Sequence, residues 1–362
     1  MCFWIWGLRF LKKIFVPIMA CLIIVSVIAK YVHVSLTAQF ILSCLAIVPL
    51  AGLMGRSTEA IAAYAGPRIG GLISASFGNA VELIIGIFAL KAGLLTLVKA
   101  SITGSILGNL LFVLGVSFIV GGIRHPIQRF NIRAARNQGS MLILGVVIAF
   151  VLPEVFSSQG SHVSLVLSSV VAFVSFLLYI SGLLFTLITH QDIFDNMDKS
   201  ASDEEGIPWR PRTASIILLF STVLVSLESD WLVESVRDIA TRLGWSEAFI
   251  GIVVVAIVGN AAEHASAVWM AWKDRMDLSL EIAIGSSLQV AMFIAPILFF
   301  VSLSFKNPMP LLFSWPELAS MFFAVLLVVV LMLDGESNWL EGAMAVGAYI
   351  VMAVGFYTLP AL

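Results

Sequence analysis

Long apolar stretches separated by short polar connections run through almost the whole chain. A helix that crosses a bilayer needs about 20 mostly apolar residues, and on that measure the pattern predicts about eleven such helices. The predicted spans are 14–30, 34–54, 68–91, 97–122, 139–154, 163–189, 212–232, 247–272, 279–303, 311–333 and 339–359. The stretch at 139–154 is short unless its helix begins inside the preceding loop. We therefore expect an all-α membrane protein.

Composition excludes a water-soluble globular protein. The chain is 60% hydrophobic and 12% charged, whereas soluble domains have about 45–50% apolar and about 25% charged residues. The lipid bilayer is the expected surrounding, and a net charge of −2 gives no reason to expect nucleic acid. Three cysteines are too few for a disulfide framework. The sequence leaves open whether copies of the chain form a homo-oligomer.

Arginine and lysine predict the orientation, because they concentrate in cytoplasmic loops. Basic residues gather at 9–13 and again in the loop at 123–138. The start of the chain resembles a signal peptide, but no cleavage site precedes a soluble domain, so we expect a retained first helix with a cytoplasmic N-terminus. The acidic connector at 190–211 would also lie on the cytoplasmic side of the membrane. Short loops without long targeting tails favour a bacterial cytoplasmic membrane.

An internal repeat divides the chain. GNAVE at 78–82 recurs as GNAAE at 259–263, and GSILGNLLFVLG from Gly104 has its counterpart GSSLQVAMFIAP from Gly285, both at an offset of 181 residues. The predicted organisation is an N-terminal helix at 1–33, five-helix repeats at 34–189 and 212–362, and the connector between them. An odd number of spans per repeat makes the halves inverted, and inverted-repeat transporters bind substrate near the midplane between halves.

One glutamate lies near the middle of an apolar span in each half, Glu82 and Glu263. A charge at that depth costs about 2.5–3.5 kcal/mol on insertion scales, so we expect a function for it. If the halves are related by a two-fold axis, both carboxylates converge, and two facing carboxylates resist joint ionisation. Either a divalent cation or protons relieve this conflict. Such mutual exclusion is what an antiporter requires.

Oxygen-bearing side chains accompany both glutamates. Asn79 and Asn260 each stand three residues before a glutamate, which places each pair on one helix face. The following span of each half supplies Ser105, Asn109, Ser286 and Gln289. Calcium takes roughly six to eight oxygen ligands, whereas copper and zinc prefer sulfur and imidazole ligands that are scarce here. We expect these residues to hold Ca²⁺; hydrogen bonding between helices is the alternative role.

His264 follows Glu263 and has no counterpart, because Leu83 occupies the matching place. Adjacent helix residues point about 100° apart, so His264 need not touch the same ion. A histidine titrates near neutrality. We expect it, with Glu82 and Glu263, to take part in proton coupling; simple packing is the alternative.

The two motifs resemble those of the calcium/cation antiporter superfamily, in its bacterial calcium/proton exchanger branch. AGPRIGGLISASFGNAVELI at 65–84 and GSSLQVAMFIAP at 285–296 extend the resemblance over most of the chain. The resemblance implies alternating access, with calcium and protons sharing the two glutamates, and a four-helix centre made from spans 68–91, 97–122, 247–272 and 279–303. The sodium/calcium branch is less similar, because it usually has a proline in the repeated motif and neither motif here contains one.

We therefore expect a transporter that exports Ca²⁺ in exchange for H⁺, with no cofactor and no enzymatic activity. A sodium-coupled exchanger, or one that carries Mn²⁺ or K⁺, is the main alternative. A cation channel is less favoured because no TVGYG-like filter is present. An intramembrane metalloprotease would need HExxH, which the chain lacks.

Overall fold

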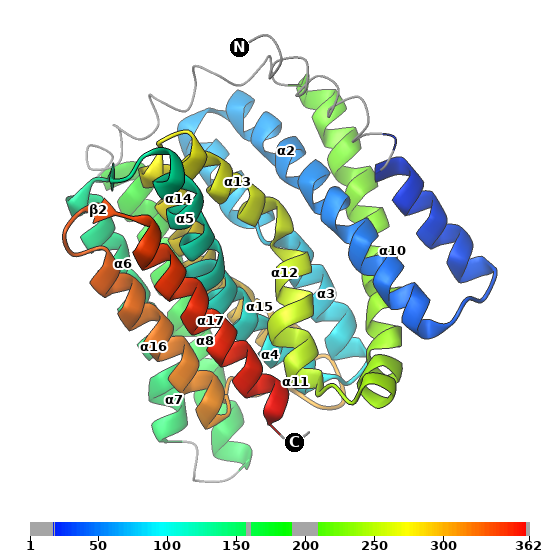
Figure 1. Ribbon diagram of the computed structural model, residues 1–362. Coiled ribbons are helices and arrows are strands. Elements are labelled where there is room, and N and C mark those ends of the chain that lie inside the picture. Colours follow the sequence, from blue (N-terminus) through cyan, green and yellow to red (C-terminus); the bar gives the residue numbers. More distant parts are fainter. Residues whose placement is uncertain (1–16, 18, 157–160, 190–208, 360–362) are drawn as a thin grey trace.

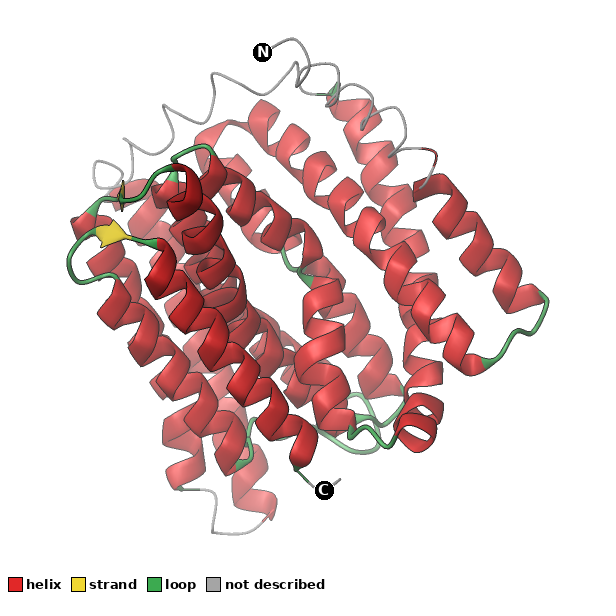
Figure 2. Ribbon diagram, in the orientation of Figure 1, coloured by secondary structure: helices red, strands yellow, loops and turns green. Residues whose placement is uncertain are grey.

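Helices make up nearly all of the computed structural model of the protein (Figure 1, Figure 2). The structure describes residue 17 and residues 19–156, 161–189 and 209–359. The first helix is Met19–Tyr31. The acidic connector predicted at 190–211 lies outside the described residues except for its last three positions.

The first half runs from the long helix α2 to residue 189. Its helices and strand are α2 (Leu36–Phe77), α3 (Ala80–Lys91), α4 (Leu95–Leu107), α5 (Leu114–Arg124), β1 (Gln128–Arg129), α6 (Ile132–Val146), α7 (Leu152–Val155) and α8 (Ser161–Leu184). Short π-helical segments join or extend several of them: η1 (Gly108–Val113), η2 (Val147–Val151) and η4 (Phe185–Thr189).

The second half begins at α10. Its elements are α10 (Pro211–Leu243), α11 (Glu247–Phe249), η5 (Ile250–Val255), α12 (Ala256–Gly259), α13 (Ala261–Trp272), α14 (Met276–Gln289), η6 (Val290–Ile294), α15 (Ala295–Ser302), α16 (Trp315–Leu331), β2 (Glu336–Ser337) and α17 (Trp339–Thr358). Two helices begin at the offset of the sequence repeat: α3 at Ala80 corresponds to α13 at Ala261, and α4 at Leu95 corresponds to α14 at Met276.

Seven helices in the described part are long and apolar enough to cross a membrane. They are Leu36–Gly66, Leu95–Arg124, Ile132–Val155, Leu165–Thr189, Pro211–Leu243, Met276–Ser302 and Trp339–Thr358. A bent pair, Glu247–Gly259 with Ala261–Trp272, turns by 63° and is an eighth candidate. Met19–Tyr31 and Trp315–Leu331 are apolar but shorter. The protein is therefore a multi-pass membrane protein.

Three boundaries differ from the sequence prediction. The spans predicted at 34–54 and 68–91 were expected to be separated by a loop, but α2 continues through it to Phe77, with only Gly66 (φ 81°) outside helical geometry. The helix expected at 139–154 begins at Ile132, because Asn131 caps it by accepting hydrogen bonds from two backbone N–H groups. The helix expected at 212–232 continues to Leu243 and ends at Gly244 in the left-handed conformation.

A two-stranded antiparallel ribbon joins loops of the two halves. Gln128 pairs with Ser337 and Arg129 with Glu336. Beside it, the Gln128 side chain donates to Asp274 Oδ1 at 2.9 Å, and the backbone N–H of Asn131 donates to Asp277 Oδ1 at 2.6 Å. Loops far apart in sequence are thus connected at the end of the molecule where β2 lies in Figure 1.

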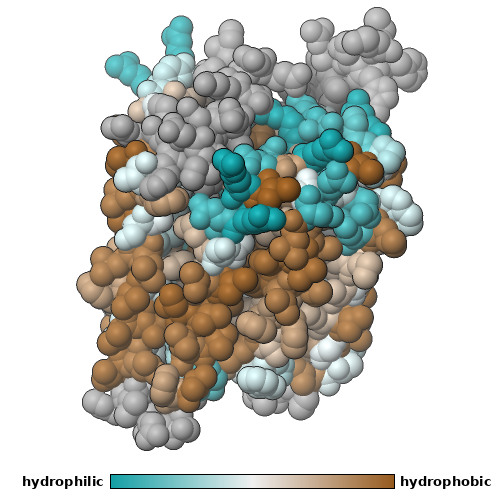
Figure 3. Space-filling view, turned by 90° about the vertical axis from the view of Figure 1, so that its left-hand side faces the viewer, coloured by the Kyte–Doolittle hydropathy of each residue, from teal (hydrophilic) through white to brown (hydrophobic). Residues whose placement is uncertain are grey.

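The surface fits a membrane environment. Figure 3 shows a broad apolar area over the middle and lower part of one face, with hydrophilic residues gathered toward the upper end. Large apolar side chains such as Leu219 and Phe220 of α10 are 68% and 62% exposed, as expected for side chains that contact lipid. Polar groups of the interior concentrate where α3, α4, α12, α13 and α14 approach one another.

Candidate functional site

Each repeated motif interrupts a helix at its asparagine. Asn79 has φ −98° and ψ 28°, between Gly78 and α3, and Asn260 has φ −93° and ψ 8°, between α12 and α13. Asparagine is a preferred N-cap residue because its side chain can accept from the first backbone N–H groups of a helix. Neither asparagine makes that local bond. Both side chains are directed instead to residues of the other half.

The glutamates stand in the first turn of the helices that follow these breaks. Glu82 lies in the first turn of α3, and Glu263 in the first turn of α13. The N-terminal end of a helix carries partial positive charge from its unpaired N–H groups, which favours a carboxylate there. The helix breaks therefore place the two acidic groups where part of their charge is compensated, and leave the carboxylate oxygens free to face a cation.

The two carboxyl groups reach across to each other's helix break. A methyl group built on Gly259 would lie 3.2 Å from Glu82 Oε1, and one built on Gly78 would lie 3.4 Å from Glu263 Oε1. These two contacts correspond at the 181-residue offset. Each carboxyl group therefore lies beside the helix break from which the other carboxyl group's helix begins. The structure thus brings together the two acidic side chains that the sequence singled out.

Each carboxyl group has an oxygen without a hydrogen-bond partner. Glu82 Oε1 and Glu263 Oε2 are occluded from solvent and unbonded, and so is the side-chain oxygen of Asn260. A buried polar atom that lacks a partner costs free energy. Three such oxygens at one place are a set that a cation or protons would satisfy.

On one side of the site, a chain of hydrogen bonds leads from Asn79 to the second half. Ser286 Oγ donates to Asn79 Oδ1 at 3.1 Å, and the Asn79 amide donates to Gln289 Oε1. Asn109 Nδ2 donates to Ser286 Oγ at 2.9 Å. Ser286 also lies within interaction range of Glu263. Four of the predicted ligand residues therefore form one connected network.

On the other side, Asn260 makes the corresponding contact with the first half. Its Nδ2 donates to Ser105 Oγ and to the Ala256 carbonyl, both at 2.9 Å. The pair of Asn260 with Ser105 matches the pair of Asn79 with Ser286 at the repeat offset. The matching stops there, because position 290, which corresponds to Asn109, is Val290. The site has two-fold pairing at its centre and different surroundings on its two sides.

Both polar helices change geometry at or directly after one of their ligand candidates. A π-helical segment begins at Gly108, next to Asn109, and another begins at Val290, next to Gln289. π-helical turns are rare and are frequently found at functional sites. Their position here was not predicted, because nothing in the apolar pattern distinguishes a π turn from an α turn.

His264 stands beside the network and is 9% exposed. Its Nε2 lies 3.1 Å from Asn109 Oδ1, and its ring meets Phe112 edge-on with centroids 6.3 Å apart. It also lines a cavity of about 470 Å³ with Val120, Ala265, Val268, Trp269 and Trp272. His264 therefore touches the hydrogen-bonded network on one side and an open space on the other.

The donor set determines which ion chemistry the site supports. In the described residues no group of three or more histidine, cysteine, aspartate and glutamate side chains comes together. The site instead combines two carboxylates with amide and hydroxyl oxygens, which suits hard cations such as calcium rather than zinc or copper. All eight predicted ligand residues lie at or beside this place.

Known proteins with similar sequences are calcium/proton antiporters. The chain is 48% identical to the Ca²⁺/H⁺ antiporter ChaA of Bacillus subtilis, over 96% of this chain and all of that protein. It is 43% identical to a Ca²⁺/H⁺ antiporter of Synechocystis over 90% of this chain and 92% of that protein. These matches confirm the resemblance predicted from the two motifs.

Solved structures and a family model place the chain with the same group of proteins as its sequence relatives. The native structure of YfkE matches with a TM-score of 0.84 and 45% identity, over 96% of this chain and all of that one. An H⁺/Ca²⁺ exchanger named CAX, 16% identical, shares the fold with a TM-score of 0.71, over 96% of this chain and 92% of that one. The family model described as sodium/calcium exchanger protein matches residues 35–188 and 213–358. The chain belongs to this exchanger family.

Proposed function

We propose that the protein exchanges Ca²⁺ for H⁺ by alternating access and exports calcium from the cytoplasm. The names of its relatives support this reaction. The observation that carries it in this chain is the crossed placement of Glu82 and Glu263, each against the helix break of the opposite half. Two carboxylates this close accept a divalent cation or protons in place of each other. No cofactor is required.

The proposed calcium ligands are the two carboxylates with the amide and hydroxyl groups around them: Glu82, Glu263, Asn79, Asn260, Ser105, Asn109, Ser286 and Gln289. Most of these polar atoms bond to one another, whereas Glu82 Oε1, Glu263 Oε2 and Asn260 Oδ1 have no partner. In this arrangement the unpartnered oxygens bind the ion first, and the amides and hydroxyls turn toward it. Protonation of the glutamates then releases it.

His264 is proposed to pass protons between the site and the cavity beside it. Its contact with Asn109 and its position at the wall of that cavity support this role. Imidazole can carry a proton in either of two ring positions, which suits a relay.

The proposed topology has about eleven spans: the N-terminal helix and two inverted five-helix repeats at 34–189 and 212–362. The proposed location is the cytoplasmic membrane of a bacterium, with the N-terminus on the cytoplasmic side. The contacts that recur at the 181-residue offset support the repeat. A reporter fused to the N-terminus and to each loop in turn tests the orientation. Activity of the N-terminal fusion on the periplasmic side would contradict it.

Calcium uptake into everted membrane vesicles tests the reaction. An acidic lumen should drive calcium inward, and Glu82→Gln or Glu263→Gln should abolish uptake, because each removes a carboxylate of the proposed pair. Glu247→Gln, at the start of α11, is the matched control and should retain uptake. Uptake that survives in either site variant would contradict the assignment of the site.

The driving ion is tested in the same vesicles. Replacing the proton gradient by a sodium gradient should give no calcium uptake, and a sodium-driven flux would establish the sodium-coupled alternative. Competition by Mn²⁺ or K⁺ measures how strongly the site selects calcium. A flux that ignores both gradients would indicate a channel.

A further inference from the structure

A third glutamate is buried inside the helical part of the molecule, away from the two repeated motifs. Glu228 of α10 is 1% exposed. The predicted span ended at 232, which placed this residue near a helix end, but α10 continues to Leu243. The residue 181 positions earlier, in the first half, is Ile47. Glu228 is therefore not part of the duplicated site and has no role in the proposed exchange.

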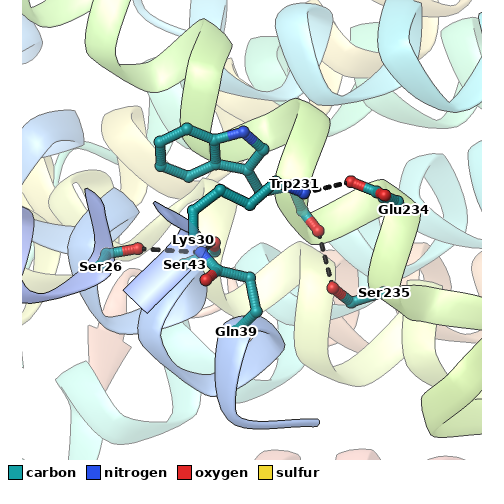
Figure 4. Close-up of polar contacts among 7 residues, drawn as sticks. All are labelled: Ser26, Lys30, Gln39, Ser43, Trp231, Glu234 and Ser235. Carbon is teal, nitrogen blue, oxygen red and sulfur yellow. Dashed lines mark hydrogen bonds and ion pairs between the residues drawn. The ribbon is translucent and has the colours of Figure 1, made fainter. Parts of the chain in front are cut away.

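Three residues from two other helices surround this carboxyl group. Ser26 of the helix Met19–Tyr31 donates to Glu228 Oε2 at 2.7 Å. Gln39 of α2 donates from Nε2 to Ser26 Oγ and to Ser43 Oγ, both at 3.3 Å. Figure 4 shows Gln39 reaching toward Ser26 from the neighbouring helix. Ser43 also lies within interaction range of Glu228. The cluster therefore connects α10 to α2 and to the N-terminal helix.

Two buried oxygen acceptors in this cluster have no hydrogen-bond donor. Glu228 Oε1 and Gln39 Oε1 are both occluded from solvent and have no hydrogen-bond partner, while both Gln39 N–H groups are directed at the serines. An ionised carboxylate here would be buried with no cation in contact among the residues that the structure describes. A single proton on Glu228 removes the negative charge and turns one of the carboxyl oxygens of Glu228 into a hydrogen-bond donor. Buried polar groups are almost always paired.

The nearest charged groups do not supply that compensation. Lys30 bonds to Glu234 at 2.5 Å (Figure 4), and six residues of helix place Glu234 about 9 Å along the axis from Glu228. Arg242 of α10 bonds to Asp238 at 2.8 Å. Among the side chains that the structure describes, the other titratable groups on α10 and on the helices packed against it are Cys21, Tyr31, Cys44, Arg56, Glu59, Tyr64, Glu82, Lys91, Arg212, Asp230, Arg237 and Glu247. All of these are exposed except Cys44, Glu247 and Glu82, and Glu82 belongs to the central site.

We propose that Glu228 is a third proton-binding carboxyl group, separate from the central pair, and that its bound proton holds α10 against α2 and the N-terminal helix. Loss of the proton places an uncompensated charge between three helices, and the contact opens. The helices α2 and α10 are the first long helices of the two halves. The proton on Glu228 would therefore make the packing of the two halves depend on pH, whether or not calcium is bound. This inference does not depend on the exchange reaction.

Infrared spectroscopy of the full chain in lipid tests the protonation directly. The spectrum at neutral pH should contain a protonated-carboxyl C=O band that shifts in D₂O and disappears in Glu228→Gln. Subtracting the two spectra cancels the contributions of Glu82 and Glu263. Asp230→Asn, on the exposed face of the same helix, is the matched control and should leave the band unchanged. A difference spectrum without this band at neutral pH would overturn the proposal.

Thermal unfolding tests the consequence for helix packing. In the unaltered chain the unfolding temperature should fall as pH is raised through the range in which the band is lost. Glu228→Gln keeps the shape of the neutral acid and should remove that dependence, whereas Ser26→Ala should weaken the contact at every pH. If Glu228→Gln and the unaltered chain show the same pH dependence, the proton does not hold the helices together.

Discussion

Glu82 lies against Gly259, so the carboxyl group of the first half lines the helix break of the second. Glu263 and Gly78 form the corresponding contact. A helix normally presents a Cβ at every position, and here the absence of that atom leaves room for an acidic side chain. The glycine of each GNA motif therefore provides the space that the glutamate side chain of the other motif occupies.

Gly259→Ala should impair calcium transport without unfolding the protein. The added methyl group would lie 3.2 Å from Glu82 Oε1, and overpacking of this kind typically costs about 1–3 kcal/mol. Because about 1.4 kcal/mol changes an affinity tenfold, we expect about a tenfold rise in the calcium concentration for half-maximal uptake. Gly347→Ala, with open space around the new methyl group, is the control. Equal uptake by both variants would contradict the close approach.

Two adjacent serines of α14 should differ in their importance. Ser286 bonds to Asn79 and Asn109 of the first half, whereas Ser287 bonds only to the Ala283 carbonyl of its own helix. Ser286→Ala leaves buried amides without a partner, at a cost of about 1–3 kcal/mol, and should weaken calcium uptake about tenfold. Ser287→Ala should retain the affinity of the unaltered chain. Binding isotherms for the two purified variants make the comparison, and similar losses in both would refute a specific role for Ser286.

His264→Gln should change how transport depends on pH. The substitution removes the imidazole, whose two ring nitrogens can each carry a proton, while retaining an amide that can reach Asn109. Because the proposed relay then lacks its proton carrier, calcium uptake should depend less steeply on pH, with calcium affinity little changed. His125→Gln, beside Asp274 in the loop that follows α5, should keep the original profile. An unchanged profile in His264→Gln would leave packing as its role.

The contact between Asp277 and the start of α6 should contribute to stability. Asp277 accepts from the Asn131 backbone N–H at 2.6 Å. Hydrogen bonds to charged groups are worth about 1.5–3 kcal/mol, and partial exposure reduces this, so Asp277→Ala should lower the free energy of unfolding by about 1 kcal/mol. Thermal unfolding in detergent measures it, with Asp230→Ala as an exposed control. Identical unfolding temperatures would show that the contact is dispensable.

The sequence predicted the helical fold and the meeting of the glutamates because both depend on strong, simple signals. Apolar length identifies helices in a bilayer whatever their packing. Motifs repeated at a fixed offset place Glu82 and Glu263 at corresponding positions of the sequence. The asparagines followed from their spacing to the glutamates. These inferences needed only local pattern and symmetry.

Other features required the folded chain. The apolar pattern does not show that α2 continues past residue 54, because Arg56, Glu59 and Arg68 interrupt it and resemble a loop. It does not show that α10 extends to Leu243, and the predicted end at 232 placed Glu228 close to a helix end. The structure instead buries Glu228 inside α10 and bonds it to Ser26 of the N-terminal helix.

The ribbon between β1 and β2 pairs a loop of residues 128–129 with a loop of residues 336–337, on opposite sides of the connector between the halves. Association of the halves thus depends on contacts that form after synthesis, in addition to the covalent link. A gene divided within the segment encoding residues 190–208 would then produce two polypeptides able to find each other in the same membrane and reconstitute the complete fold.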